Sequence, residues 1–247
     1  MIRYRPKGAV PDDPRLDRLV PDDFSHVEKW PLTTAVIPSK PVPVTIGVNW
    51  YENFDDPHKD ARGRWWIGVG NLGRIRGGHC VCLEPGDPVD GGTFQDNPSW
   101  WTFYNQGREG ACVGFGSSRM MSLLNRKRYD ARWLWDRAKE RDEWLDTNPG
   151  DDNGTSVRAA MDALRALGHE PWGQAGPVLA EGISANRWAT KVDQVTAALQ
   201  SPANDRMGAV RVLNSWGRSY PHRVWMPYET LQRLIDEDGE ATVVTDR

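Results

Sequence analysis

Apolar residues recur at helical spacing in several stretches from Cys112 onward, and these stretches predict five helices. In the first stretch, apolar positions within 113–124 share one helix face. Gly168 directly follows the third stretch and is typical of a helix C-terminus, while Thr190 and Asp193 have the spacing of a capping box at the fourth. The predicted helices span 112–127, 131–144, 157–167, 192–199 and 228–235.

Short apolar runs predict four strands, over 43–50, 78–83, 209–213 and 242–245. The segment 1–42 is rich in Pro and Asp and has no sustained periodicity, so we expect an extended strap there. The rest, 43–247, is expected to be one domain without internal repeats. Its parts are a strand segment at 43–83, a Gly- and Pro-rich linker at 84–99, a helical part at 100–200 and a C-terminal part at 208–247.

Composition and charge narrow the classes of function. The chain has 247 residues, with 31 Lys and Arg against 34 Asp and Glu, and its basic residues are dispersed, which argues against a nucleic-acid partner. No stretch approaches the ~20 apolar residues of a membrane span, and the N-terminus lacks the apolar core of a signal peptide. Three cysteines do not form a disulfide framework. We therefore expect a cytoplasmic protein with neither a membrane nor a nucleic-acid partner.

A cysteine at the start of the first predicted helix is the strongest candidate for chemistry. Cys112 lies in the segment 105–115, which reads NQGREGACVGF. The dipole and the free N–H groups at a helix start favour a thiolate. Gln106, six residues upstream, can direct its amide at an oxyanion beside the Cys112 N–H. The segment thus predicts a cysteine nucleophile with an oxyanion-binding side chain.

Two further motifs supply an imidazole and an amide. His79 lies in RGGHCV at 76–81, on a predicted strand, and Asn214 begins NSWG at 214–217, just after another. Together with the Cys112 segment, these motifs resemble the active-site segments of the papain family of cysteine peptidases. Weaker matches extend the resemblance over roughly 43–245, but only these three motifs are specific.

The resemblance implies an α+β fold, in which a helical subdomain carrying the nucleophile packs against an antiparallel β-barrel subdomain carrying His79 and Asn214. Cys112 would be the nucleophile, His79 the base, Asn214 the residue that orients the imidazole, and Gln106 part of the oxyanion hole. The residues expected to line the substrate site are Gly78, Gly154, Thr155 and Trp216, the last also covering the His–Asn hydrogen bond. The implied reaction is hydrolysis of a peptide or protein substrate through a thioester, with no cofactor and no metal.

The order of the motifs differs from the usual papain arrangement, in which the nucleophile comes first. Here His79 precedes Cys112, as though the block 43–83 had been transposed from a place before the Asn214 strand. If so, strand 78–83 pairs antiparallel with strand 208–214, and 200–207 forms a short exposed turn. A second Trp-Gly pair that often follows the Asn motif is replaced by RSYP at 218–221.

Other interpretations remain open at this point. His79, Cys80 and Cys82 could suggest a metal site, but residues 80 and 82 point to the opposite strand face from His79 and fit the core better. Segment 146–152 has the composition of a calcium loop without the closing Glu of an EF-hand. The Trp pairs at 65–66 and 100–101 are either core or a stacking surface. The same triad could serve an acyltransferase, or the fold could serve as an assembly component that contacts phage virion proteins.

Overall fold

The fold was analysed in a computed structural model that describes residues 38, 40–86, 99–142 and 154–246. Nearly all of the expected strap 1–42 and most of the linker 84–99 lie outside the described residues. The segment 146–152, with its calcium-loop composition, lies outside them entirely.

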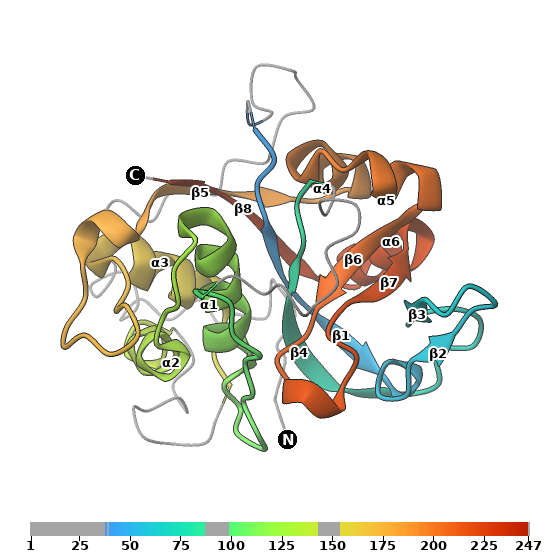
Figure 1. The fold of residues 1–247 in the computed structure, drawn as a ribbon, viewed down its shortest axis with the longest axis horizontal. Helices are drawn as coiled ribbons and strands as arrows, with labels where there is room; N and C mark the ends of the chain where they lie inside the picture. The colour runs from blue at the N-terminus through green and yellow to red at the C-terminus, as the bar shows by residue number, and fades with distance from the viewer. Residues whose placement is uncertain (1–37, 39, 87–98, 143–153, 247) are drawn as a thin grey trace, which may run out of the picture.

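Eight strands form one sheet, in the order β2-β3-β7-β6-β4-β1-β8-β5 (Figure 1). The strands are β1 (Val44–Tyr51), β2 (His58–Lys59), β3 (Trp65–Trp66), β4 (Ile75–Leu83), β5 (Ile183–Ala189), β6 (Ala209–Leu213), β7 (Val224–Pro227) and β8 (Glu240–Asp246). All described pairings are antiparallel except that of β3 with β7. Strand β5 and strand β2 lie at opposite ends of this order, so the expected closed barrel is wrong: the sheet is open.

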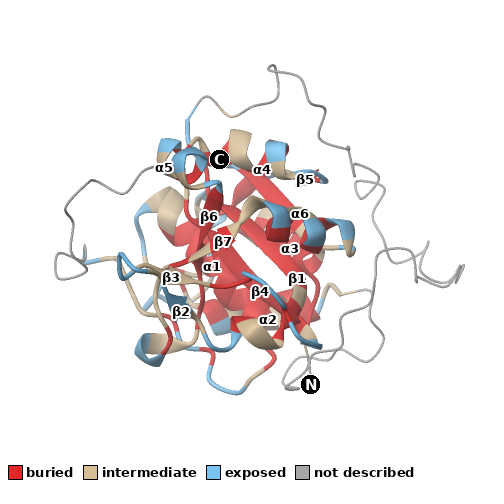
Figure 2. Cartoon of the chain, turned by 90° about the vertical axis from the view of Figure 1, so that its right-hand side faces the viewer, coloured by how far each residue is buried: buried red, intermediate tan, exposed pale blue. Residues whose placement is uncertain are grey.

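Six α-helices surround the sheet in the described part of the chain. They are α1 (Cys112–Asn125), α2 (Ala131–Lys139), α3 (Val157–Leu167), α4 (Val192–Leu199), α5 (Pro202–Met207) and α6 (Tyr228–Asp236). Helices α1 to α3 gather on one side of the sheet, and α4 to α6 lie on the other (Figure 1). Strand β1 contacts helices from both groups, which explains why nearly every residue in it is buried (Figure 2). The predicted α+β class, with the Cys112 helix packed against a sheet, agrees with this arrangement.

Helix starts follow the sequence signals closely, but the predicted helix 131–144 is too long, because α2 ends at Lys139. Gly168 ends α3 at a φ of 82°, a left-handed conformation that only glycine adopts without strain. At α4 the expected capping pair of Thr190 and Asp193 is wrong by one residue. The side chain of Gln194 accepts hydrogen bonds from the N–H groups of Thr190 and Lys191, at 2.7 and 3.2 Å. Gln194 is the third helical residue, the position from which a side chain reaches back to the cap.

Strand β4 pairs with β6 in the antiparallel sense, as predicted. Cys82 lies opposite Leu213 and Leu83 opposite Val212, although about 130 residues separate the two strands in sequence. The segment before β6 was predicted as a short exposed turn, and this is wrong. It contains helix α5, begun by Pro202 and capped by Ser201, whose hydroxyl accepts from the Asn204 N–H at 3.2 Å, and both Ser201 and Asn204 are buried.

Two glycines let helix α1 approach its neighbours closely. A Cβ built on Gly114 would lie 2.4 Å from the Ala131 carbonyl oxygen of α2, and one on Gly116 would lie 2.9 Å from the Cys80 sulfur of β4. The polypeptide therefore needs glycine at both positions for α1 to pack simultaneously on α2 and on β4. This packing places the start of α1 against the middle of β4.

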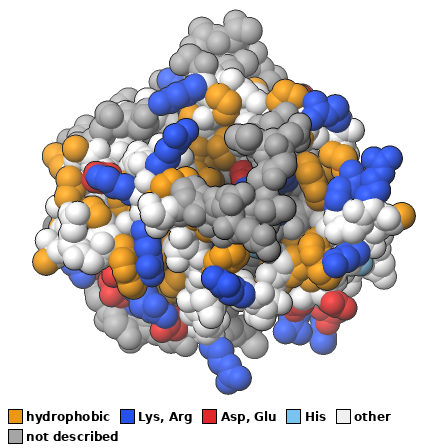
Figure 3. Space-filling view, viewed as in Figure 1, with side chains coloured by type: hydrophobic (Ala, Val, Ile, Leu, Met, Phe, Trp, Pro, Cys, Tyr) orange, Lys and Arg blue, Asp and Glu red, His pale blue; other side chains and the backbone are white. Residues whose placement is uncertain are grey.

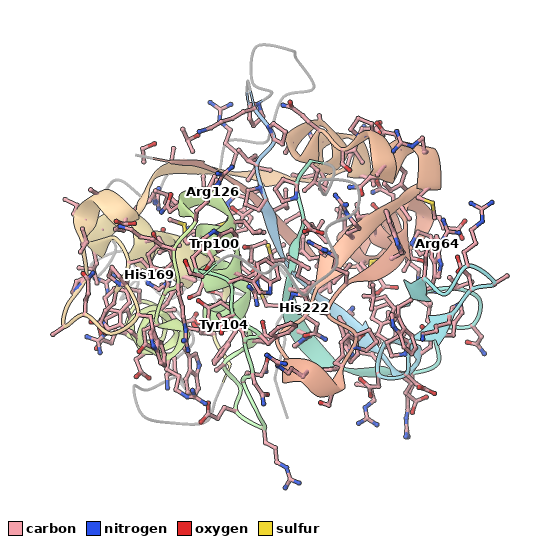
Figure 4. All side chains as sticks on the ribbon, in the orientation of Figure 1. Arg64, Trp100, Tyr104, Arg126, His169 and His222 are labelled. Atoms are coloured by element: carbon pink, nitrogen blue, oxygen red, sulfur yellow. The ribbon has the colours of Figure 1, made fainter. Side chains whose placement is uncertain are left out.

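Two histidines outside this packing, the buried His169 and the half-buried His222, make stability sensitive to acid. The Nδ1 atom of His169 accepts the Glu170 N–H at 2.8 Å and its Nε2 lies 2.8 Å from Ser118 Oγ, on the helical side of the molecule (Figure 4). Burial lowers the pKa of His169 to about 3, and burial also lowers the pKa of His222 to about 3. Both groups therefore stay neutral in the folded protein and become protonated first in the unfolded chain.

We expect stability to be complete above the unfolded histidine pKa of about 6.5 and to fall as pH drops from there towards 3, by up to ~1.4 kcal/mol per pH unit and per group. Thermal unfolding measured against pH tests this. His169→Gln should flatten the slope, while the same change at the exposed His58 should not. A slope unaffected by His169→Gln would contradict this assignment.

Candidate active site

His79 and Asn214 come from neighbouring strands and meet directly. The Nε2 atom of His79, in the middle of β4, lies 2.9 Å from Oδ1 of Asn214, the first residue after β6. Both residues are buried, and Asn214 Oδ1 also accepts the Ser215 N–H at 2.7 Å. Because Oδ1 is an acceptor, the imidazole donates from Nε2, which leaves the lone pair on Nδ1 for a second partner. The β4–β6 pairing thus produces the contact that the motifs suggested.

Two tryptophans enclose the His79 ring. The Trp216 ring lies 5.0 Å from it between centroids, inclined at 33°, and the Trp50 ring lies 4.6 Å from it, edge-on. Trp216 was expected to shield the His–Asn contact, and its position agrees. Trp50 was missed by the sequence reasoning. It lies diagonal to His79 across the β1–β4 ladder, in which Trp50 opposes Gly77 and Val48 opposes His79, so a register prediction could have found it.

Cys112 is the first residue of α1 and lies against the strand that carries His79. No side chain caps the start of α1, so its first N–H groups remain directed at the helix end. Cys112 belongs to one buried cluster with Cys80 and Cys82 of β4, and the backbone at Cys80, Val113 and Cys112 acts to lower the pKa of its thiol. Helix α1 packs on β4, and Cys80 directly follows His79 in that strand, so the start of α1 lies beside the His79 segment. The expected approach of Sγ to within roughly 4 Å of the imidazole stays a prediction.

Burial governs the protonation of both groups and corrects one expectation. Burial raises the pKa of the Cys112 thiol to about 11, and the surrounding N–H groups oppose this rise without cancelling it. Burial likewise lowers the pKa of His79 to about 4, opposed by the Asn214 hydrogen bond. The prediction that the helix start favours a thiolate is therefore wrong for this structure, because the desolvation of the thiol raises its pKa more than the helix dipole lowers it. Burial also raises the pKa of the Cys80 and Cys82 thiols, that of Cys82 above that of Cys112, and the expected preferential alkylation of Cys112 stays a prediction.

Gln106 joins the nucleophile loop to the Asn214 loop. Its backbone N–H donates to Ser215 O at 2.9 Å, and neighbouring Asn105 forms an antiparallel bridge with Trp216. Its side-chain Nε2 donates to Glu109 O at 3.1 Å, which commits one amide hydrogen and leaves the second. Gly107, at a φ of 65°, turns the loop back towards α1. Gln106 is buried beside the loop that holds Asn214, a position compatible with its expected role.

The other expected substrate-binding residues lie in two places. Gly78 is buried in β4 opposite Asn49, next to His79. Thr155 lies before α3, where its hydroxyl donates to Asp142, and Gly154 precedes it, half-buried. None of the described hydrogen bonds or ring contacts of Thr155 reaches His79, Cys112 or Asn214. Their contact with a substrate stays a prediction.

The structure also shows where Cys80, Cys82 and the two Trp pairs lie. Cys80 and Cys82 are free thiols in the core between α1 and β4, on the opposite face of β4 from Val81 and Leu83. Within the described ranges, no group of three or more His, Cys, Asp or Glu side chains is arranged to hold a metal ion. Trp101 stacks on the buried guanidinium of Arg119 at 4.4 Å and Trp66 packs near Trp225, so both Trp pairs contribute to internal packing.

On the face drawn in Figure 3, Lys and Arg side chains occur at several separate places among apolar and neutral groups. Among the helices that the structure describes, none has both the length and the apolar character needed to cross a membrane.

Comparisons with known proteins give one structural likeness. No family model and no curated protein matches the chain. The solved structure of xylellain, a cysteine protease from Xylella fastidiosa, is similar with a TM-score of 0.46 and 14% sequence identity. The superposition covers 61% of this chain and 84% of xylellain. Similarity at this level assigns the chain to no family.

Proposed function

We propose that the protein is a cysteine peptidase that hydrolyses peptide bonds through Cys112, His79 and Asn214. One observation carries the proposal: the 2.9 Å contact between His79 Nε2 and Asn214 Oδ1, formed beside Trp216 on β4, the strand against which helix α1 packs with Cys112 as its first residue. Nucleophilic catalysis by cysteine needs a histidine with one nitrogen fixed by an amide and the other facing the thiol, and the His79–Asn214 contact supplies the first of these two features. A purely structural core has no need of this combination.

The reaction follows from these positions. The imidazole Nδ1 takes the proton from Cys112 Sγ as the sulfur attacks the substrate carbonyl carbon, and the carbonyl π electrons move to oxygen. The resulting oxyanion accepts hydrogen bonds from the Cys112 N–H and the free amide hydrogen of Gln106. The C–N bond then breaks, the imidazolium protonates the leaving amine, and a thioester remains. Water, deprotonated by His79, attacks the thioester and releases the acid and the thiol.

Transfer of a proton from Cys112 to His79 is compatible with the burial of both residues. Each charge alone is disfavoured, since burial raises the pKa of Cys112 to about 11 and lowers the pKa of His79 to about 4. Moving the proton from one to the other leaves the pair neutral overall, and the attraction between thiolate and imidazolium offsets part of the desolvation cost. We therefore propose that ionisation is coupled to substrate attack rather than complete beforehand.

The motif order is part of the proposal. We propose that 43–83 is a re-sited block that supplies the strands on which a papain-like site depends. In support, β4 lies between β1 from the same block and β6, which leads to Asn214. The order His79, Cys112, Asn214 in sequence is thereby compatible with one continuous site.

Product analysis on a peptide mixture tests the proposal. The wild type should release new amino and carboxyl termini, and Cys112→Ala should release none, whereas Cys80→Ala should remain active. Repeating the reaction with a primary amine separates hydrolysis from acyl transfer by the same thioester, because transfer gives an amide product. Absence of both products, with a folded wild type, would contradict the proposal and favour the assembly role in a virion.

A further inference from the structure

The loop that leads to Cys112 is closed on itself by two hydrogen bonds between Gln106 and Glu109. The Glu109 N–H donates to the Gln106 carbonyl oxygen at 3.4 Å, and the Gln106 side-chain Nε2 donates to the Glu109 carbonyl oxygen at 3.1 Å. A carbonyl oxygen at this place needs a donor, so it disfavours the reversed amide, in which Oε1 would face another oxygen. The position of Glu109 therefore fixes which way the Gln106 amide points.

The carboxylate of Glu109 is in turn held by helix α2. Its Oε2 accepts a hydrogen bond from Arg132 Nε at 2.9 Å and lies 2.8 Å from Arg132 Nη2. Arg132 is the second residue of α2, and its backbone N–H donates to the side chain of Asp130, which caps the helix. Its guanidinium also lies over the ring of Phe115 in α1, 5.5 Å from the ring centroid. The ion pair thus attaches the loop to both helices.

On these contacts, and resting on the proposed function, we propose that Glu109 and Arg132 form a positioning ion pair for the oxyanion hole. The two donors to the oxyanion come from different elements, the Cys112 N–H from α1 and the Gln106 amide from the loop. The distance between them depends on where the loop lies relative to α1. Helix α1 packs closely on α2 through Gly114, so an anchor on α2 holds the loop in place relative to α1 as well. The pair acts through Gln106 and not through the thiol.

Arg132→Met tests this because it removes the charge and keeps an unbranched side chain beside Phe115. The side chains of the pair are 53% and 39% exposed, so we expect kcat for peptide hydrolysis to fall by up to about fivefold, the effect of losing one exposed ion pair. KM should not change, because the oxyanion forms only in the transition state. The rate of Cys112 alkylation by iodoacetamide should also stay at the wild-type value, since alkylation forms no oxyanion. An equal fall in the alkylation rate would overturn the inference.

A double-mutant cycle shows whether the ion pair acts through Gln106. In a Gln106→Ala background, Arg132→Met should lower kcat no further, because the amide that the pair positions is absent. A fall of the same size in both backgrounds would mean that the two residues act independently, and the inferred role would be wrong.

The controls separate this inference from the proposed function. Arg137→Met removes another ion pair of α2, between Arg137 and Glu140 at 2.8 Å, and none of its described contacts reaches the loop. This variant should keep the wild-type kcat, and thermal unfolding should show that it and Arg132→Met are both folded. A folded wild type that cleaves no peptide would contradict the proposed function itself. An active wild type whose kcat is unchanged in Arg132→Met would overturn only the role of the ion pair.

Discussion

Replacing His79 with alanine is expected to lower kcat/KM for peptide hydrolysis by ~10⁴-fold or more, the size of loss seen when the base of such a triad is removed. The imidazole bonds Asn214 Oδ1 at 2.9 Å and lies on β4, the strand against which helix α1 packs. Without it, the thiol of pKa about 11 stays protonated near neutral pH.

The matched control is His58→Ala, at an exposed position on β2. This variant should keep the wild-type rate. Initial rates on a peptide that the wild type cleaves measure both variants, with thermal unfolding to verify that each is folded. A His79→Ala protein that retained more than a tenth of the wild-type rate would exclude His79 as the base.

Replacing Gly114 with alanine is expected to destabilise the protein by about 1–3 kcal/mol. The added Cβ would lie 2.4 Å from the Ala131 carbonyl oxygen and 2.7 Å from Trp135 Cβ, so α1 and α2 would have to separate. Intrinsic helix propensity alone predicts the opposite sign, a gain of about 1 kcal/mol for alanine over glycine. The free energy of unfolding of the variant, measured in urea, therefore shows whether the steric contact or the helix propensity has the larger effect on stability.

The control for Gly114→Ala lies on the same helix. Ser117 is fully buried and, among the described residues, its hydroxyl has no hydrogen-bond partner, so Ser117→Ala should be neutral or slightly stabilising. A Gly114→Ala variant as stable as Ser117→Ala would show that α1 and α2 are not held as closely as the structure describes.

Local pattern was sufficient to predict the parts of the fold that carry the site. We predicted β1 and β4 from their apolar runs and α1 from the helical periodicity after Cys112. All three predictions lie close to the observed bounds. The pairing of β4 with β6 came from chemistry, since His79 and Asn214 can meet only if their strands are adjacent. The requirement that His79 and Asn214 lie in one site thus predicted a long-range strand pairing, which the periodicity of the sequence alone cannot predict.

Other features depended on tertiary packing and were missed. The strands β2 and β3 have two residues each, too short for any periodicity. Strand β5 has no regular alternation, because its four middle residues of seven are exposed or half-buried. Helix α5 was read as a turn because its six residues PANDRM have turn-like composition, although Pro202 at its start is a known helix signal.

The protonation of the site could not be predicted from the sequence for a related reason. A cysteine at a helix start has a lowered pKa only while water still reaches it, and Cys112 is 2% exposed. The depth of burial depends on how α1 packs on β4 through Gly114 and Gly116, which no local pattern reveals.

Covalent labelling with a peptidyl epoxide, mapped by mass spectrometry of the digested protein, tests the central claim most directly. The account predicts one label per chain on Cys112, retained in Gln106→Ala because Gln106 acts on the oxyanion, strongly slowed in His79→Ala and absent in Cys112→Ala. Labelling spread equally over Cys80, Cys82 and Cys112, or a wild type that takes up no label while folded, would contradict it.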